Sequence, residues 1–253
     1  MLKDKKLHFI FDVDGCLTPK FQVIQEQLHS IMMKLSSRHP VSIVTGSEIS
    51  NSISQIGEKL VNNLYMSFNC LGNAIYQNRR LIKQNFWYPE QSLIDLLNEC
   101  MEKSAFPYRT AKHFDLRTGT LNFSVIGRNA TFEQRNEYFL FDKKCSERLK
   151  IAARLIEQFP YVDISIGGNT SIDIQPKGRN KAQIVEYVTN DYLVFFGDGY
   201  GQWGNDQPLF DVIEKNNLGN THKVDSWQDT MAILRNEYQE CVYEERKVYE
   251  AYE

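Results

Sequence analysis

The first third of the chain alternates between short apolar runs and helical stripes of apolar residues. Residues 7–11 form an apolar run too short for a helix, which predicts a buried strand with Asp12 at its carboxyl end. Residues 24–35 and 49–60 carry apolar side chains at helical spacing, which predicts two amphipathic helices. Further strands are expected at 41–45, at 64–68 and in a hairpin of 74–76 with 80–82. Strand–helix–strand alternation of this kind predicts a parallel sheet.

The pattern changes in the middle of the chain to that of an α+β module. The elements expected there are a helix over 89–104, a hairpin over 114–126 turning at Thr118 and Gly119, helical structure over 131–159, and a hairpin of 162–166 with 171–175 turning at Gly167 and Gly168. From Lys181 the α/β pattern returns with a helix, a strand over 192–196 and a short strand near Lys223. We therefore expect an α/β core of residues 1–83 and 181–253 that is interrupted by an α+β domain over 84–180. The acidic, tyrosine-rich tail over 236–253 is expected to be a solvated or packing helix.

Composition narrows the class of protein. The chain is 42% hydrophobic and 24% charged with a net charge of −3, and its basic and acidic residues are interspersed, so no nucleic-acid surface or polybasic membrane patch is indicated. No apolar run is long enough to span a bilayer, and the first run is too short for a signal peptide, so we expect a cytoplasmic protein. The five cysteines are odd in number and form no CxxC pair, which predicts free thiols and no zinc site.

Two aspartates stand where the first strand ends. In Asp12-Val13-Asp14-Gly15 the carboxylates are two residues apart, which aims both the same way before the chain turns, so that Asp12 can attack while Asp14 handles protons. An aspartate nucleophile that attacks phosphorus needs a cation to screen the repulsion between two anions. Asp198, directly after a later strand, and Asp206 supply further carboxylates, and oxygen ligands of this kind suit magnesium.

Two more residues complete the expected site. Thr45 ends the second strand and offers a hydroxyl donor, and Lys181 opens a helix and offers a fixed positive charge for a transferring phosphoryl group. Each residue alone is weak evidence, because Thr45 alone would be interpreted as an ordinary strand end and Lys181 alone as an ordinary surface lysine. Their order along an α/β frame, together with Asp12 and Asp198, predicts a phosphoryl-transfer enzyme.

These motifs resemble the four motifs of the haloacid dehalogenase superfamily. The resemblance rests on Phe11-Asp-Val-Asp-Gly-Cys-Leu-Thr, Thr45-Gly-Ser, Lys181, and Gly197-Asp198 with Asn205-Asp206. It implies a doubly wound parallel sheet with an inserted α+β cap, a nucleophilic Asp12 and an acid–base Asp14. It also implies magnesium held by Asp12, the Asp14 main-chain carbonyl and Asp198.

Within that superfamily the chain most resembles the eukaryotic-type phosphomannomutases. Residues 117–128 with Arg135 are similar to the cap segment whose arginines bind the distal phosphate, so the resemblance implies that Arg117, Arg128 and Arg135 do so here. A second similar stretch, from Gly167 to Lys181, implies that Ser171 and Asp173 contact the sugar. The loop between Asp198 and Asn205 also has the length seen in these mutases. The resemblance implies a phosphorylated sugar as substrate, a hexose 1,6-bisphosphate as activator, and a homodimer through the cap.

The chain departs from the family pattern at several positions. Phe21 stands where the mutases carry an arginine, and Lys20 is the nearest cation able to bind substrate in its place, although a point charge does not reproduce a guanidinium fork. Lys177 and Asn180 replace the usual acidic pair before Lys181, Cys16 stands where threonine is common, and the second metal site after Phe210 is not reproduced.

Three functions therefore stay open at this point. The first is a phosphohexomutase that interconverts mannose 6-phosphate and mannose 1-phosphate. The second is a sugar- or metabolite-phosphate phosphatase on the same scaffold, which Phe21 favours. The third is a non-catalytic relative, which Asp12 and Asp14 argue against.

Overall fold

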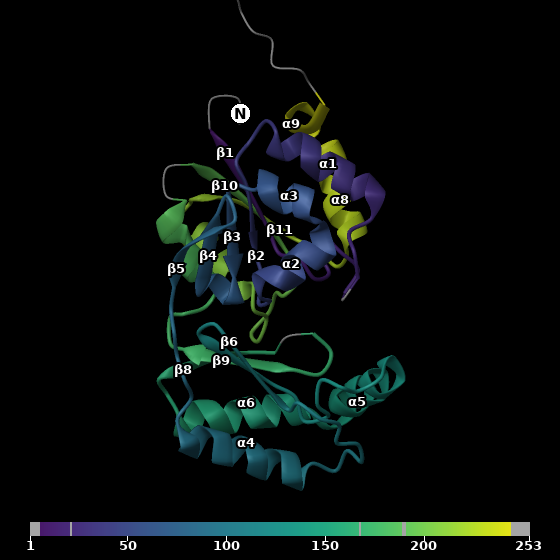
Figure 1. Ribbon diagram of the computed structural model, residues 1–253, viewed down its shortest axis with the longest axis vertical. Coiled ribbons are helices and arrows are strands. Elements are labelled where there is room, and N and C mark those ends of the chain that lie inside the picture. The colour runs from purple at the N-terminus through teal and green to yellow at the C-terminus, as the bar shows by residue number, and fades with distance from the viewer. Residues whose placement is uncertain (1–5, 21, 167, 189–190, 244–253) are drawn as a thin grey trace, which may run out of the picture.

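The computed structural model describes residues 6–20, 22–166, 168–188 and 191–243, and they form two sheets, each with its own helices (Figure 1). The larger unit contains the strands β1 (Leu7–Phe11), β2 (Val41–Val44), β3 (Met66–Asn69), β4 (Ala74–Gln77), β5 (Arg80–Gln84), β10 (Tyr192–Gly197) and β11 (Gly219–Lys223). Its helices are α1 (Glu26–Ser36), α2 (Ile49–Ile56), α3 (Glu58–Asn63), α7 (Gln207–Lys215), α8 (Trp227–Asn236) and α9 (Gln239–Tyr243), with the 3₁₀ segments η1 (Cys70–Gly72) and η2 (Lys181–Tyr187).

The strands of the larger unit follow the order β11-β10-β1-β2-β3-β4-β5. The predicted parallel sheet is confirmed over β11 to β3, and the predicted hairpin of β4 and β5 extends it in antiparallel pairing. Helices cover both faces, because α1, α8 and α9 pack on the side of Phe9 and Phe11, whereas η2 and α7 pack on the side of Ile10. Burial on both faces explains why β1 is a continuous apolar run and not an alternating one.

The smaller unit consists of β6 (Phe114–Arg117), β7 (Thr120–Phe123), β8 (Val162–Ser165) and β9 (Ile172–Pro176) with helices α4 (Gln91–Lys103), α5 (Phe132–Cys145) and α6 (Glu147–Gln158). Its sheet is antiparallel in the order β6-β7-β9-β8. An apolar row, which includes Phe123 and Ile172, packs with buried residues of α4 and α6. The opposite face looks toward the larger unit (Figure 1).

That opposite face carries a polar row across all four strands. Asp115 pairs with Asn122, Asn122 with Asp173, and Asp173 with Ser165. Directly opposed residues of antiparallel strands share one face, so strand alternation alone separates this polar row from the apolar core beneath it.

Three expected elements differ in detail. The helical stretch over 131–159 is two helices, because Ser146 adopts a left-handed conformation (φ 55°, ψ 43°) that ends α5 and precedes α6. The element that begins at Lys181 is a 3₁₀ helix, and the last strand lies at Gly219–Lys223, slightly before the position expected. In the tail, Tyr238 and Val242 are buried in the core and residues 244–253 lie outside the described part.

Both connections between the two units contact Asn73. The Asn85 amide, on the outgoing connection, donates to the Asn73 carbonyl at 2.8 Å, and Asn73 Nδ2 donates to the Arg179 carbonyl, on the returning connection, at 3.2 Å. Gly119 packs against the same place with φ +68°, where a Cβ would lie 2.6 Å from the Asn85 carbonyl oxygen. A side chain at position 119 therefore would not fit.

The cysteines and the helices bear on two further expectations. All five cysteines are free thiols, as predicted. Within the described residues, no helix combines the length and the apolar character required to cross a bilayer.

Candidate active site

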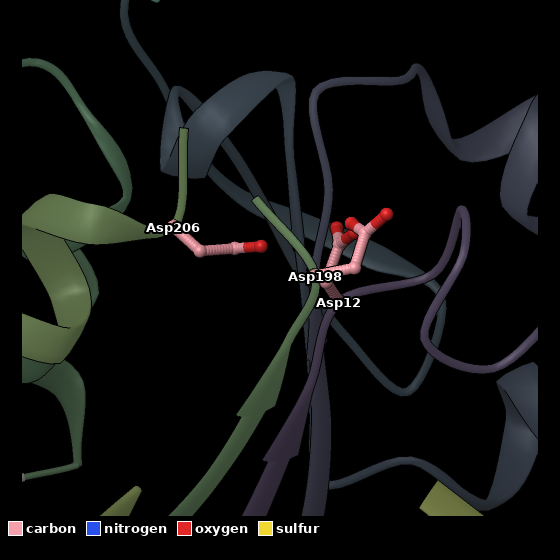
Figure 2. A group of neighbouring side chains, drawn as sticks. All are labelled: Asp12, Asp198 and Asp206. Carbon is pink, nitrogen blue, oxygen red and sulfur yellow. The ribbon is translucent and has the colours of Figure 1, made fainter. Parts of the chain in front are cut away.

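Three carboxylates gather at the carboxyl edge of the parallel sheet. Asp12 follows β1 and Asp198 follows β10, and these strands are parallel neighbours with Phe11 opposite Phe196. One carboxylate oxygen from each of Asp12, Asp198 and Asp206 lies within 4.8 Å of the others. Figure 2 shows Asp206 directed toward the other two from the start of α7. The predicted proximity of Asp12 and Asp198 is therefore confirmed.

Lys181 places an ammonium between two of these carboxylates. Its Nζ donates to Asp12 Oδ1 at 2.7 Å and to Asp206 Oδ1 at 2.6 Å, and its side chain is fully buried. Burial alone would lower the pKa of Lys181, but attraction to the two carboxylates outweighs burial and raises that pKa, so the side chain stays charged. Asp206 also accepts a bond from the Gly199 amide at 2.8 Å, which fixes its second oxygen.

The carboxylate cluster fits a hard divalent cation. Burial raises the pKa values of Asp12 and Asp198, with Lys181 and Lys20 respectively opposing that effect, so an added cation would stabilise both charged forms. Three carboxylates with oxygens within 4.8 Å of one another are an oxygen-only ligand set of the kind Mg²⁺ takes. Asp12 and Asp198 line the cavity described below, whereas Asp206 is fully buried beside Lys181.

Asp14 and Thr45 lie at the same edge. Asp14 Oδ1 accepts a hydrogen bond from Gln55 Nε2 at 2.7 Å, and its side chain lines the cavity beside Asp12. Thr45 directly follows β2, and its Oγ1 accepts from the Ser47 amide at 3.2 Å. These positions suit a proton-exchanging carboxyl group and a hydroxyl donor for a ligand in the cavity.

Lys20 takes a position that the sequence did not predict. Its Nζ lies 2.9 Å from Asp198 Oδ2, and its side chain is 46% exposed. Burial opposes protonation of Lys20, but its pKa is raised because the Asp198 carboxylate attracts the ammonium. Phe21, the departure beside it, lies outside the described residues.

The polar row of the smaller unit faces the carboxylate cluster across a cavity. Asn122 Nδ2 donates to Asp173 Oδ1 at 2.7 Å, and Asn122 Oδ1 accepts from Arg128 Nη1 at 2.9 Å. Arg128 also lies 3.3 Å from Asp115 Oδ2. The side chain of Arg128 is 35% exposed and lines the cavity, so it retains surface for an anionic ligand.

Arg117 connects the two units. Its Nη1 donates to the Gly46 carbonyl at 2.9 Å, and its Nε donates to Asp115 Oδ2 at 2.9 Å. Beside it, the Thr118 amide donates to Glu48 Oε1 at 2.9 Å. Two of the guanidinium nitrogens of Arg117, Nε and Nη1, therefore donate to acceptors of the protein itself.

Arg135 and Ser171 lie on the segments around Arg128 and Asp173. Arg135 donates to Thr170 Oγ1 at 3.2 Å and to the Ala130 carbonyl at 3.2 Å, and it does not reach the cavity lining. Ser171 lines the cavity, and its carbonyl accepts from Arg148 Nη1 at 3.3 Å.

The cavity between the units has a volume of about 860 Å³. From the larger unit it is lined by Asp12, Asp14, Lys20, Thr45 and Asp198, and from the smaller unit by Arg117, Arg128, Ser171 and Asp173. The wall of the larger unit therefore offers carboxylates, a hydroxyl and an ammonium group, and the wall of the smaller unit offers two guanidinium groups and a carboxylate. An anionic group of a ligand fits beside the guanidinium groups, and a second anionic group would fit beside the carboxylates only with a cation bound there.

The chain matches a known protein family over most of its length. A family model described as eukaryotic phosphomannomutase matches residues 28–240. The chain belongs to this family.

Relatives named phosphomannomutase align with this chain over nearly its whole length. A phosphomannomutase of Saccharomyces cerevisiae is 32% identical over 236 residues, covering 89% of this chain and 91% of its own length. Phosphomannomutase 1 of Homo sapiens is 32% identical over 240 residues, covering 89% of this chain and 90% of its own. Among solved structures, a haloacid dehalogenase-like hydrolase from Bacteroides thetaiotaomicron matches with a TM-score of 0.54 and 14% identity, covering 92% of this chain and 99% of that one. The expected haloacid dehalogenase fold is confirmed.

The sequence of this phosphomannomutase family member did not predict several residues that lie at or near its site. Asn122 stands opposite Asp173 in the sheet register, so the alternation of residues along the two hairpins could have predicted that Asn122 faces the site. Arg148 forms a buried ion pair with Asp142, with Nε 2.8 Å from Oδ2, and a helical pattern gives no sign of this contact. Gln55 reaches Asp14 from a distant helix, and only the fold brings the two together.

Proposed function

We propose that this chain is a magnesium-dependent phosphohexomutase that interconverts mannose 6-phosphate and mannose 1-phosphate. The observation that carries the proposal is the cavity in which Asp12 and Asp198 face Arg128 and Asp173 from the opposite wall. A mutase must hold one phosphate while the other reacts, and guanidinium groups bind phosphate oxygens well. Membership of the family and relatives named phosphomannomutase support the same activity.

The proposed chemistry starts from a hexose 1,6-bisphosphate. An Asp12 oxygen attacks one phosphorus, the bond from phosphorus to the sugar oxygen breaks, and Asp14 gives a proton to that oxygen. An incoming hexose monophosphate then loses the proton of its free hydroxyl to Asp14, and its oxygen takes the phosphoryl group from Asp12. The bisphosphate formed turns around, and Asp12 takes the other phosphoryl group. Magnesium, when bound by Asp12, Asp198 and the Asp14 carbonyl, with Asp206 beside them, screens the charges that meet during attack.

We assign the remaining residues as follows. Lys181 holds Asp12 and Asp206 in place, and Thr45 donates to the transferring phosphoryl group. Arg128 binds the distal phosphate, with Arg117 and Arg135 positioned around it, while Ser171 and Asp173 contact the sugar and Lys20 supplies a further cation. In this proposal residues 84–180 form the cap that excludes water, and residues 1–83 and 181–253 form the core.

The test is an incubation with Mg²⁺ and mannose 1-phosphate, with and without glucose 1,6-bisphosphate. Formation of mannose 6-phosphate that depends on the bisphosphate supports the mutase, and its loss in Asp12→Asn ties it to the nucleophile. Asp95→Asn, an exposed change on α4, should keep wild-type turnover. Rapid release of free phosphate without isomerisation would instead identify a phosphatase, and inertness toward both reactions would identify a non-catalytic relative.

A cap-to-cap homodimer in the cytoplasm is part of the same proposal. Exposed apolar side chains on the smaller unit support an interface there, with Phe132 82% and Leu140 51% exposed on α5. Sedimentation should report twice the monomer mass, reduced toward the monomer in Phe132→Glu. A wild-type monomer would contradict the dimer without touching the proposed reaction.

A further inference from the structure

The three clustered carboxylates form ion pairs with two lysines that differ in exposure. Lys181 pairs with Asp12 and Asp206, and its side chain has no exposed surface. Lys20 serves Asp198 at 2.9 Å from a side chain that is 46% exposed. Lys181 is thus fixed inside the fold, whereas Lys20 can leave Asp198 for solvent or for a ligand without opening the core.

The contact of Lys20 with Asp198 depends on Gly15. Gly15 has φ +93°, and a Cβ there would lie 2.2 Å from Asp198 Oδ2 and 3.0 Å from Lys20 Cε. The lysine chain therefore crosses the bare face of the glycine to reach the carboxylate. The ammonium is held at the mouth of the cluster, beside the cavity.

A divalent cation on Asp12 and Asp198 would compete with this ammonium. Both need the Asp198 carboxylate, and two positive charges a few ångströms apart in a partly desolvated site repel each other strongly. Lys20 also lines the cavity together with Asp14 and Arg128, so a displaced ammonium could reach an anionic ligand bound in the cavity.

We infer that Lys20 is a positioning residue that occupies Asp198 in the metal-free protein and is exchanged for the divalent cation when the metal binds. The released ammonium then turns toward the phosphate of the substrate, so metal and phosphate strengthen each other's binding. The inference rests on the proposed function, because it takes the carboxylate cluster to be the metal site. It gives Lys20 two successive partners, where a structural counter-ion would keep one.

The test measures metal binding directly, without turnover. Mn²⁺ serves as the probe, and the free ion is followed by electron paramagnetic resonance in wild type, Lys20→Gln, Lys20→Arg and Lys215→Gln. Lys215 is a matched control, because it is an exposed lysine paired with Asp211 on α7 and its change removes the same charge. Without phosphate, Lys20→Gln should bind Mn²⁺ about three- to tenfold more tightly than wild type, while Lys20→Arg and Lys215→Gln stay near wild type.

A second measurement tests the coupling. Inorganic phosphate should bind wild type more tightly when Mn²⁺ is saturating, and this enhancement should shrink several-fold in Lys20→Gln, because coupling between two ligands is reciprocal. Unchanged or weaker Mn²⁺ binding in Lys20→Gln would overturn the exchange. The absence of a Mn²⁺ site in wild type, or a Mn²⁺ site that persists in Asp198→Asn, would refute the proposed metal centre and the exchange together. Mutase assays on the same preparations report separately on the proposed reaction.

Discussion

Lys181 Nζ lies 2.7 Å from Asp12 Oδ1, and neither side chain is more than 6% exposed. The same ammonium also serves Asp206, so Lys181→Met would leave two buried carboxylates without their cation. We expect a loss of about 3–5 kcal/mol in the free energy of unfolding and a fall in turnover of about a hundredfold or more. Urea unfolding and steady-state turnover measure the two effects.

Lys177 provides the control for this change, because it is an exposed lysine four residues earlier in the chain. Lys177→Met should alter stability by less than about 0.5 kcal/mol and leave turnover unchanged. Wild-type turnover in Lys181→Met would remove the buried ammonium from the proposed mechanism.

Asn122 joins the proposed phosphate-binding Arg128 to the proposed sugar-binding Asp173. Asn122→Ala removes two hydrogen bonds to charged groups that orient both side chains, so we expect the KM for mannose 1-phosphate to rise about tenfold or more with a smaller effect on kcat. Asn129→Ala, an exposed change in the same segment, should keep the wild-type KM. A large fall in kcat at constant KM would argue against a binding role.

Two arginines on α6 should differ sharply in their contribution to stability. Arg148 is 6% exposed, pairs with Asp142 at 2.8 Å, and donates to the Gly168 carbonyl at 3.1 Å. Arg154 is 39% exposed and pairs with Glu99 at 3.1 Å. We expect Arg148→Gln to cost about 3–5 kcal/mol, because Asp142 is left buried, and Arg154→Gln to cost at most about 1 kcal/mol. If urea unfolding gave similar losses in the free energy of unfolding for the two variants, burial would not determine how much each ion pair contributes.

His8 should make stability depend on pH. Burial lowers its pKa to about 4, although Asp191 at 3.4 Å opposes the shift, with Ser42 and Lys6 as further neighbours. The unfolded chain therefore binds a proton on His8 more readily than the folded chain does. The contribution of neutral, buried His8 to the free energy of unfolding is fully present above pH 6.5 and is lost as the pH falls toward 4. Between pH 7 and 5, wild type should lose about 2 kcal/mol more than His8→Gln in urea unfolding. Parallel pH profiles of the two proteins would contradict this.

The elements that the sequence predicted well are those whose neighbours bury them. The strand β1 is apolar throughout because helices cover both of its faces, and this made it visible without any structure. The strand β11, Gly219–Lys223, is polar and lies at the sheet edge, so its pattern resembles a loop and was placed too late. Ser146 breaks the helical segment in a left-handed conformation that is usually marked by glycine, so the pattern contained no signal for it.

The same distinction applies to the site. Asp12 and Asp198 could be predicted to meet because both follow parallel strands, and the ends of such strands lie at one edge. The contact of Lys20 with Asp198 and that of Arg117 with the Gly46 carbonyl depend on side-chain reach between loops and between the two units. Neither has a fixed spacing in sequence, so patterns alone could not reveal them.

The position of Asn73 limits how the two units can move relative to each other. The outgoing and the returning connection are both hydrogen-bonded to this one buried residue, so sliding of one sheet past the other would break both bonds at once, in addition to the bond from Arg117 to the Gly46 carbonyl. A substitution at Asn73 should therefore loosen the alignment of the two cavity walls, although Asn73 itself does not line the cavity.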